Sequence, residues 1–194
     1  MHSITLYLNL GIDHITDIAG FDHILFLIAL CAVYKLEQWR SLLVLVTAFT
    51  VGHSVTLALS SFSVIVVASN VIEFLIPVTI LVTAINNVFV HRDSSAALVI
   101  GRDYVMALFF GFIHGMGFSN YFRALLMDDS SIFAPLLGFN LGMEIAELSF
   151  VLVIVGFVYL LTNLVGIRHR DWSLFVSGAA AGISLLLMVE NRFW

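Results

Sequence analysis

Several side chains that can bind metal ions or protons lie within the apolar segments of this chain. Asp22 and His23 are adjacent in one apolar run, and His53, His114 and Glu144 each lie inside a later one. A titratable group at membrane depth costs free energy, so it usually serves a function. Imidazoles from several segments, with one or two carboxylates, suit a divalent transition metal such as Zn, Ni or Co better than copper.

The composition predicts a membrane protein. Of the 194 residues, 61% are hydrophobic and 11% are charged, whereas a soluble domain carries about 25% charged residues. The single cysteine excludes an internal disulfide. The net charge of −5 is spread thinly and provides no basic face for nucleic acid. The expected surroundings are therefore the lipid bilayer.

The elements that position these side chains are predicted to be transmembrane helices. A helix needs about 20 apolar residues to cross roughly 30 Å of hydrocarbon. We expect an all-α, compact bundle of about six such helices in a single transmembrane domain over residues 1–194, with residues 1–16 as an N-terminal segment at the outer interface. The candidate spans are 18–34, 41–60, 70–90, 104–127, 136–163 and 172–190.

The orientation is predicted from the Lys and Arg residues between the spans. Six of them fall on one side, which should be cytoplasmic; they are Lys35, Arg40, Arg92, Arg102, Arg168 and Arg170. Both termini then face outward. With a rise of 1.5 Å per residue, the titratable groups all reach the outer half of one bundle.

Two local features could bring the ligands together. His14 and His23 are nine residues apart, half a turn out of phase on a continuous helix, so the chain must bend between them if both bind one ion, and Gly20 is the expected place. The pairs Gly111/Gly115 and Gly138/Gly142 allow close helix contacts beside His114 and Glu144. The predicted metal ligands are His14, Asp22, His23, His53, His114 and Glu144.

Several segments together resemble the hydrogenase/urease accessory (HupE/UreJ) family of membrane proteins. The similar stretches are residues 11–27, 49–57, 71–73, 110–118 and 139–144. The resemblance implies a compact helical protein of the bacterial inner membrane that moves nickel or a related transition metal.

Two other functions remain open at this point. Zinc held by three histidines could activate water in an intramembrane hydrolase that cleaves a lipid or peptide bond near the outer leaflet; Glu73, Glu144 and Ser54 are its candidate catalytic residues. The sequence is also compatible with a proton- or metal-sensing accessory subunit that needs a protein partner. A homo-oligomer is possible as well. Few polar residues line the inner half, among them Asn86, Asn87 and Thr83.

Overall fold

The computed structural model is a bundle of helices and describes residues 2–65, 67–89, 96–126 and 132–194. Arg92, one of the residues used to predict the orientation, lies outside these ranges. The elements are α1 (His2–Thr16), η1 (Ile18–Gly20), α2 (Asp22–Cys31), η2 (Leu36–Gln38), α3 (Trp39–Ser61), α4 (Ser69–Phe89), α5 (Ala96–Leu125), α6 (Phe133–Asn163) and α7 (His169–Glu190). The predicted helical membrane bundle is confirmed.

Five helices are long and apolar enough to cross a bilayer: α3, α4, α5, α6 and α7. The first predicted span, 18–34, is wrong as a full crossing. Its helix, α2, has ten residues and is therefore only about 15 Å long. The apolar run looked like a span because α2 is buried on nearly all sides, and hydrophobicity alone does not distinguish a buried helix from a lipid-exposed one.

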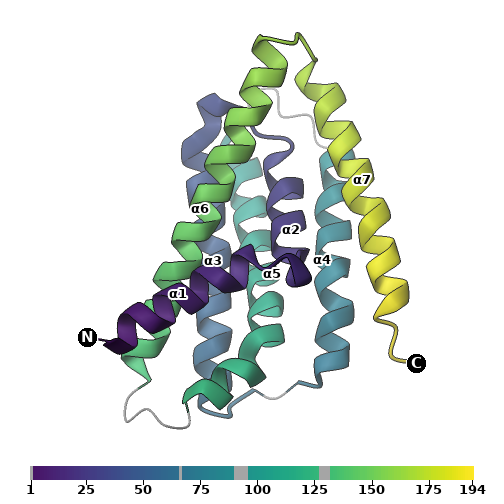
Figure 1. The fold of residues 1–194 in the computed structure, drawn as a ribbon. Coiled ribbons are helices and arrows are strands. Elements are labelled where there is room, and N and C mark those ends of the chain that lie inside the picture. The colour runs from purple at the N-terminus through teal and green to yellow at the C-terminus, as the bar shows by residue number, and fades with distance from the viewer. Residues whose placement is uncertain (1, 66, 90–95, 127–131) are drawn as a thin grey trace.

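Helix α1 and helix α2 together occupy the place expected for that span. α1 slants across α6 toward the centre of the bundle, and α2 continues from there between the longer helices (Figure 1). The short turn η1 ends at Gly20, where the sequence predicted the bend. The chain therefore changes direction between His14 and His23, and both residues remain near the bundle centre.

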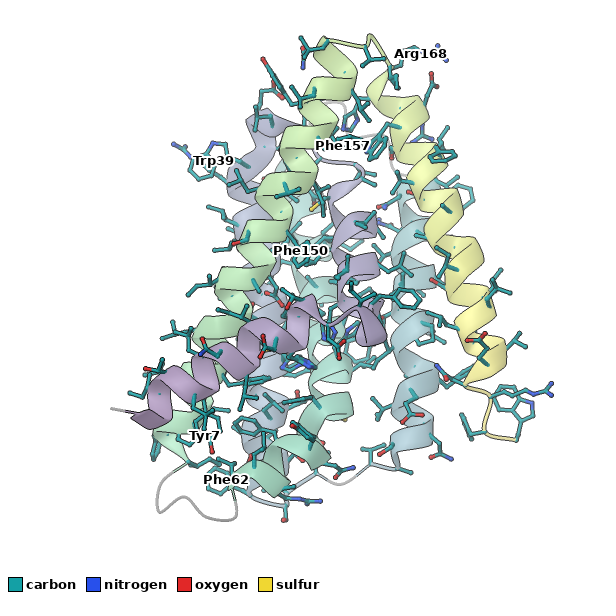
Figure 2. All side chains as sticks on the ribbon, viewed as in Figure 1. Tyr7, Trp39, Phe62, Phe150, Phe157 and Arg168 are labelled. Carbon is teal, nitrogen blue, oxygen red and sulfur yellow. The ribbon has the colours of Figure 1, made fainter. Side chains whose placement is uncertain are left out.

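The two ends of the bundle differ in charge. The end with the α6–α7 connection, called the inner end here, also holds the starts of α3, α5 and α7 (Figure 1). In or beside these segments lie Lys35, Arg40, Arg102, Arg168 and Arg170, and this charge predicts a cytoplasmic end. Trp39 and Arg168 project near this end, whereas Tyr7 and Phe62 lie toward the opposite, outer end (Figure 2). Trp39 is 50% exposed, as is typical of an aromatic residue at a membrane interface.

The packing is organised around three helix pairs: α3 with α5, α1 with α6, and α4 with α7. The main core lies between α2, α3, α4 and α5 and includes Phe26, Phe49 and Ile80, each at most 1% exposed. A smaller core at the outer end joins α1 to α5 and α6 through Tyr7, Phe122 and Phe139. The candidate site lies where these two cores meet.

Candidate metal site

Histidines from three separate elements converge inside the outer half of the bundle. His14 lies near the end of α1, His23 at the start of α2 and His53 in the outer part of α3. One ligand atom from each can be chosen so that all three lie within 4.8 Å of one another. Three nitrogens around one ion with bonds of about 2.0–2.1 Å would be roughly 3.3 Å apart, so shifts of about 1 Å would complete the site.

Close contact between glycines sets the position of His53 and His114. Gly52 and Gly111 face each other where α3 crosses α5, and a β-carbon on either would overlap the backbone of the partner helix. His53 follows Gly52 directly, and His114 lies three residues after Gly111, almost one turn along α5. The crossing therefore fixes the depth and the rotation of both histidines, since neither helix can turn or slide without a backbone clash.

The same kind of crossing positions His14. Gly11 of α1 lies against the carbonyl of Phe139, and Gly142 of α6 lies against the carbonyl of Leu8. His14 follows Gly11 by three residues, as His114 follows Gly111. Two glycine crossings, one on each side of the site, thus hold three of the four histidines in place.

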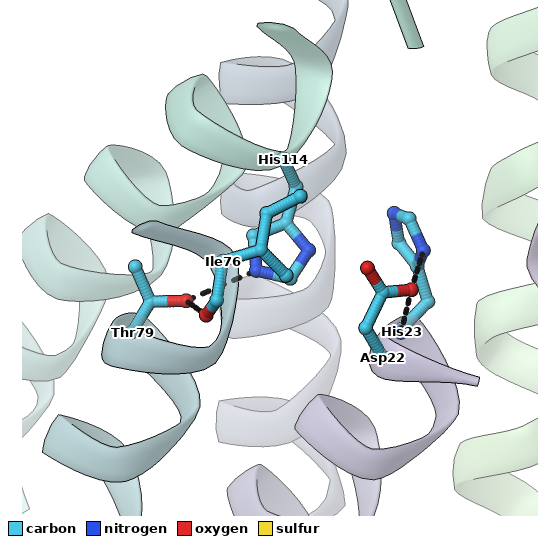
Figure 3. A network of polar contacts seen from close by, with 5 residues as sticks. All are labelled: Asp22, His23, Ile76, Thr79 and His114. Carbon is cyan, nitrogen blue, oxygen red and sulfur yellow. Dashed lines mark hydrogen bonds and ion pairs between the residues drawn. The ribbon is translucent and has the colours of Figure 1, made fainter. Parts of the chain in front are cut away.

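Asp22 orients His23. The Oδ1 atom of Asp22 accepts the backbone N–H of His23 at 2.9 Å and lies 3.0 Å from its Nδ1 (Figure 3). A carboxylate so close to Nδ1 favours the tautomer that keeps its proton there, which leaves the lone pair on Nε2. The Nε2 atom is buried and has no hydrogen-bond partner. Asp22 therefore prepares His23 to bind an electrophile through Nε2.

Thr79 orients His114 so that the other ring nitrogen, Nδ1, carries the lone pair. The hydroxyl of Thr79 donates to the carbonyl of Ile76 at 2.6 Å and lies 3.0 Å from Nε2 of His114 (Figure 3). Because the hydroxyl proton is used, Thr79 accepts from Nε2, and the lone pair of His114 is on Nδ1. That Nδ1 is also buried without a partner. The ring centroids of His114 and His23 are 5.1 Å apart, so His114 adjoins the group formed by His14, His23 and His53.

His53 gives the strongest indication of a ligand. It is fully buried, and both of its ring nitrogens lack hydrogen-bond partners. Across the described part of the chain, ten buried side-chain polar atoms lack partners, and five of them belong to His14, His23, His53 and His114. A buried polar atom without a partner costs about 1–3 kcal/mol. This concentration at one place indicates that something else satisfies these nitrogens.

An open cavity of about 520 Å³ leads from the surface to His14. It is lined by Leu10, Asp13, His14, Thr16, Asp17, Phe118 and Tyr121. Two carboxylates, Asp13 on the last turn of α1 and Asp17 directly after the helix, give this cavity a negative charge that attracts cations. Inside it the wall becomes aromatic: Phe118 lies 4.1 Å from His14, and Phe139 packs on Phe118 at 4.9 Å, between ring centroids.

The carboxylate of Glu144 lies away from the histidines, although the sequence predicted it as a ligand. Its Oε1 accepts a hydrogen bond from Thr47 at 2.7 Å, and Glu147 accepts one from Thr50 at 2.6 Å. Thr47 is six residues before His53 on α3, about 9 Å toward the inner end. Glu144 and Glu147 therefore contact α3 on the inner side of the histidines.

The other two predicted catalytic residues, Glu73 and Ser54, also contact groups other than the histidines. Glu73 is exposed at the start of α4, and its backbone carbonyl accepts from Asn191. The hydroxyl of Ser54 donates to the carbonyl of Thr50, one turn earlier on α3. The sequence reasoning missed Thr79, although Thr79, Thr83 and Asn87 recur every four residues in an apolar helix, a pattern that indicates a polar stripe.

Comparison with protein families matches residues 1–193 to the family described as HupE / UreJ protein. The match covers almost the whole chain and includes every residue of the histidine site. Neither the curated proteins nor the solved structures contain a significant match.

Proposed function

The chain belongs to the HupE/UreJ family, and from this membership and the histidine site we propose that it is a permease for a divalent transition metal. Nickel or cobalt is the expected substrate, zinc is compatible, and copper is less favoured. The expected location is the bacterial inner membrane. The observation that carries the proposal is the group of unpartnered imidazole nitrogens at the end of an open acidic cavity.

The chemistry of the site suits an ion of intermediate softness. Neutral imidazole nitrogens bind nickel, cobalt and zinc well, whereas magnesium and calcium prefer oxygen. Asp22 contributes a negative charge next to His23 and offsets part of the ion's charge. In this role Asp22 acts through His23, and the direct ligands are His14, His23 and His53, with His114 as the fourth.

The surroundings of the site favour capture from the outer side. Asp13 and Asp17 would concentrate hydrated cations in the cavity, and His14 lies both on the cavity wall and in the histidine group. An ion can thus exchange water for imidazole ligands one at a time, which keeps the cost of dehydration low at each step. A permeation site must bind strongly enough to select its ion and still release it.

The hydrolase alternative finds less support. A zinc hydrolase needs a general base within hydrogen-bond reach of the metal-bound water. Glu144 and Ser54 are hydrogen-bonded to Thr47 and to the backbone of Thr50, and Glu73 is exposed near the C-terminal tail. Asp22 is engaged with His23.

The direct test is nickel uptake into vesicles reconstituted with the purified chain. We expect His53→Ala to lower uptake at least 100-fold and to remove bound nickel, because it deletes a central ligand. Ser54→Ala is the matched control on the same helix; its hydroxyl bonds only its own helix backbone, so uptake and bound nickel should stay within twofold of wild type.

Wild-type vesicles that bind nickel but take up none under any ion or proton gradient would refute the permease. If the same purified chain, loaded with zinc, hydrolyses an added lipid or peptide, the hydrolase would then be the better account.

A further inference from the structure

A second polar cavity lies on the inner side of the histidine site. It measures about 20 Å³, enough for one water molecule or one bare ion. Its polar lining consists of Thr83, Asn86, Asn87 and Asp103, from α4 and α5. Three of these are at most 5% exposed: Thr83, Asn87 and Asp103. A carboxylate, two amides and a hydroxyl around a small space make a site with oxygen donors.

A polar stripe on α4 connects the histidines with this cavity. Thr79 contacts His114, and Thr83 and Asn87 follow at intervals of four residues on the same face of the helix. From Thr79 to Asn87 the distance along the axis is about 12 Å. The hydroxyl of Thr83 donates to the carbonyl of Thr79, so its oxygen can still accept or coordinate. The stripe thus leads inward from the last histidine.

Aromatic rings separate the two polar regions. Phe26 lies 5.4 Å from His114 between ring centroids, and it packs edge-to-face on Phe110 at 6.2 Å. Both phenylalanines also line the inner cavity. They therefore form an apolar barrier with the histidines on one side and Asp103 on the other. Phe26 is fully buried, so an ion could pass only after a side-chain rotation or a shift of α2.

Asp103 is held at the inner end by groups that another cation could replace. The hydroxyl of Tyr34 donates to its Oδ2 at 3.0 Å, and Arg102 lies 3.3 Å from its Oδ1. The side chain of Arg102 is 51% exposed, whereas that of Asp103 is 5% exposed. A guanidinium already half in water loses little on release. An arriving metal ion could therefore take the place of Arg102 beside Asp103.

We propose that Asp103, Thr83, Asn86 and Asn87 form an inner oxygen-donor site for the divalent cation, which receives the ion from the histidines across Phe26 and Phe110. The assignment rests on the proposed permease function. Oxygen donors hold nickel or cobalt less tightly than imidazoles do. Passage from the histidines to Asp103 thus leads from a selective site to a site that releases the ion, beside Tyr34.

Binding of Mn²⁺ to the purified full chain tests the site without transport. Mn²⁺ prefers oxygen ligands, and its bound fraction can be followed by electron paramagnetic resonance. We expect the His53→Ala variant to retain an Mn²⁺ site. We expect Asp103→Asn to weaken Mn²⁺ binding at that site at least tenfold. Asp171→Asn is the control: Asp171 is also an acid at the inner end, but it pairs with Arg168 and lies outside the cavity, so binding should not change.

Nickel flux in vesicles gives the second readout. Asp103→Asn should lower the maximal rate at least tenfold while the half-saturating concentration stays within threefold, because capture at the histidines is intact. Thr83→Val keeps the side-chain shape and removes only the hydroxyl oxygen, so it provides a test that does not depend on how Asp103→Asn folds. We expect it to slow flux and weaken Mn²⁺ binding about threefold or more.

The outcomes separate the two proposals. If His53→Ala stops flux while Asp103→Asn and Thr83→Val match wild type in flux and Mn²⁺ binding, the permease stands and the inner site is refuted. If wild type moves no nickel, the permease fails, and the Mn²⁺ titration alone decides whether the inner site exists.

Discussion

The histidine site and the inner cavity lined by Asp103 differ in how their polar groups are satisfied. On the outer side, a cavity of about 520 Å³ reaches His14, and the histidines present five buried nitrogens without partners. The inner cavity is about 20 Å³, and Asp103 and Asn87 in its lining have hydrogen-bond partners. The histidine site is prepared to receive a ligand, whereas these polar groups of the inner cavity already bond other parts of the protein.

In the proposed permease, this difference corresponds to a state in which the metal site is reached from the side of the acidic cavity. Opening the inner side would require the contacts around Tyr34 to break, including the hydrogen bond from its hydroxyl to Asp103 and that between its carbonyl and His169. A bound ion could drive this change only by binding the inner-open state more tightly.

The largest expected effect is in thiol labelling that tests the membrane orientation of the bundle, and so which end faces outward. In a Cys31→Ala background, a cysteine at exposed Asn70 should react with a membrane-impermeant thiol reagent in intact cells, and one at exposed Glu37 only after permeabilisation. The labelling would be all-or-none at each position. The reverse pattern would exchange the two halves and make the acidic cavity a cytoplasmic feature.

The Asp22→Asn variant tests whether Asp22 helps the histidines of the outer half to bind metal. The amide removes the negative charge beside His23 and weakens the preference for the tautomer with its lone pair on Nε2. Loss of such an orienting carboxylate costs about 10–100-fold in metal affinity. Isothermal titration with nickel measures the effect. An unchanged affinity would show that Asp22 neither binds the metal ion nor orients His23 for binding.

The glycine crossings can be tested on α6 alone. Gly142→Ala places a methyl group against the carbonyl of Leu8, whereas Gly156→Ala meets nothing within 4 Å. Overpacking of this kind costs about 1–3 kcal/mol, so the first variant should unfold at a lower temperature and bind nickel more weakly. Equal stability of the two variants would mean that α1 does not rest on α6 in the functional protein.

The smallest effect is expected at the inner closure. Tyr34→Phe removes the hydroxyl that donates to Asp103 and keeps the ring. Loss of one hydrogen bond is worth about 0.5–1.5 kcal/mol, which corresponds to about a two- to tenfold shift toward an inner-open state. Accessibility of a cysteine at Asn86 to a thiol reagent from the inner side should rise accordingly. A decrease would contradict the assignment of Tyr34 as part of the closure.

Sequence reasoning could predict the long helices because each carries an uninterrupted apolar run of sufficient length. It could not predict that α2 stops at Cys31, since a buried half-length helix has the same composition as a spanning one. The position of Gly20 in the bend was predictable because His14 and His23 are out of phase on a continuous helix.

The site was harder to predict than the helices. Counting residues from the helix ends placed Glu144 near the depth of His114, but its carboxylate accepts a hydrogen bond from Thr47 of α3. Thr47 precedes His53 by six residues, so this contact lies on the inner side of the histidines. Asp103 was also missed as a site residue, because its cavity depends on how α4 faces α5 and α2, which no periodicity in one segment reveals.

X-ray absorption spectroscopy of the nickel-loaded chain tests the central claim most directly. We predict one nickel ion per chain whose spectrum shows the outer-shell scattering of at least three imidazole rings, and the loss of that signal in His53→Ala with its retention in Ser54→Ala. A nickel ion bound by oxygen ligands alone, or an imidazole signal that persists without His53, would contradict the account.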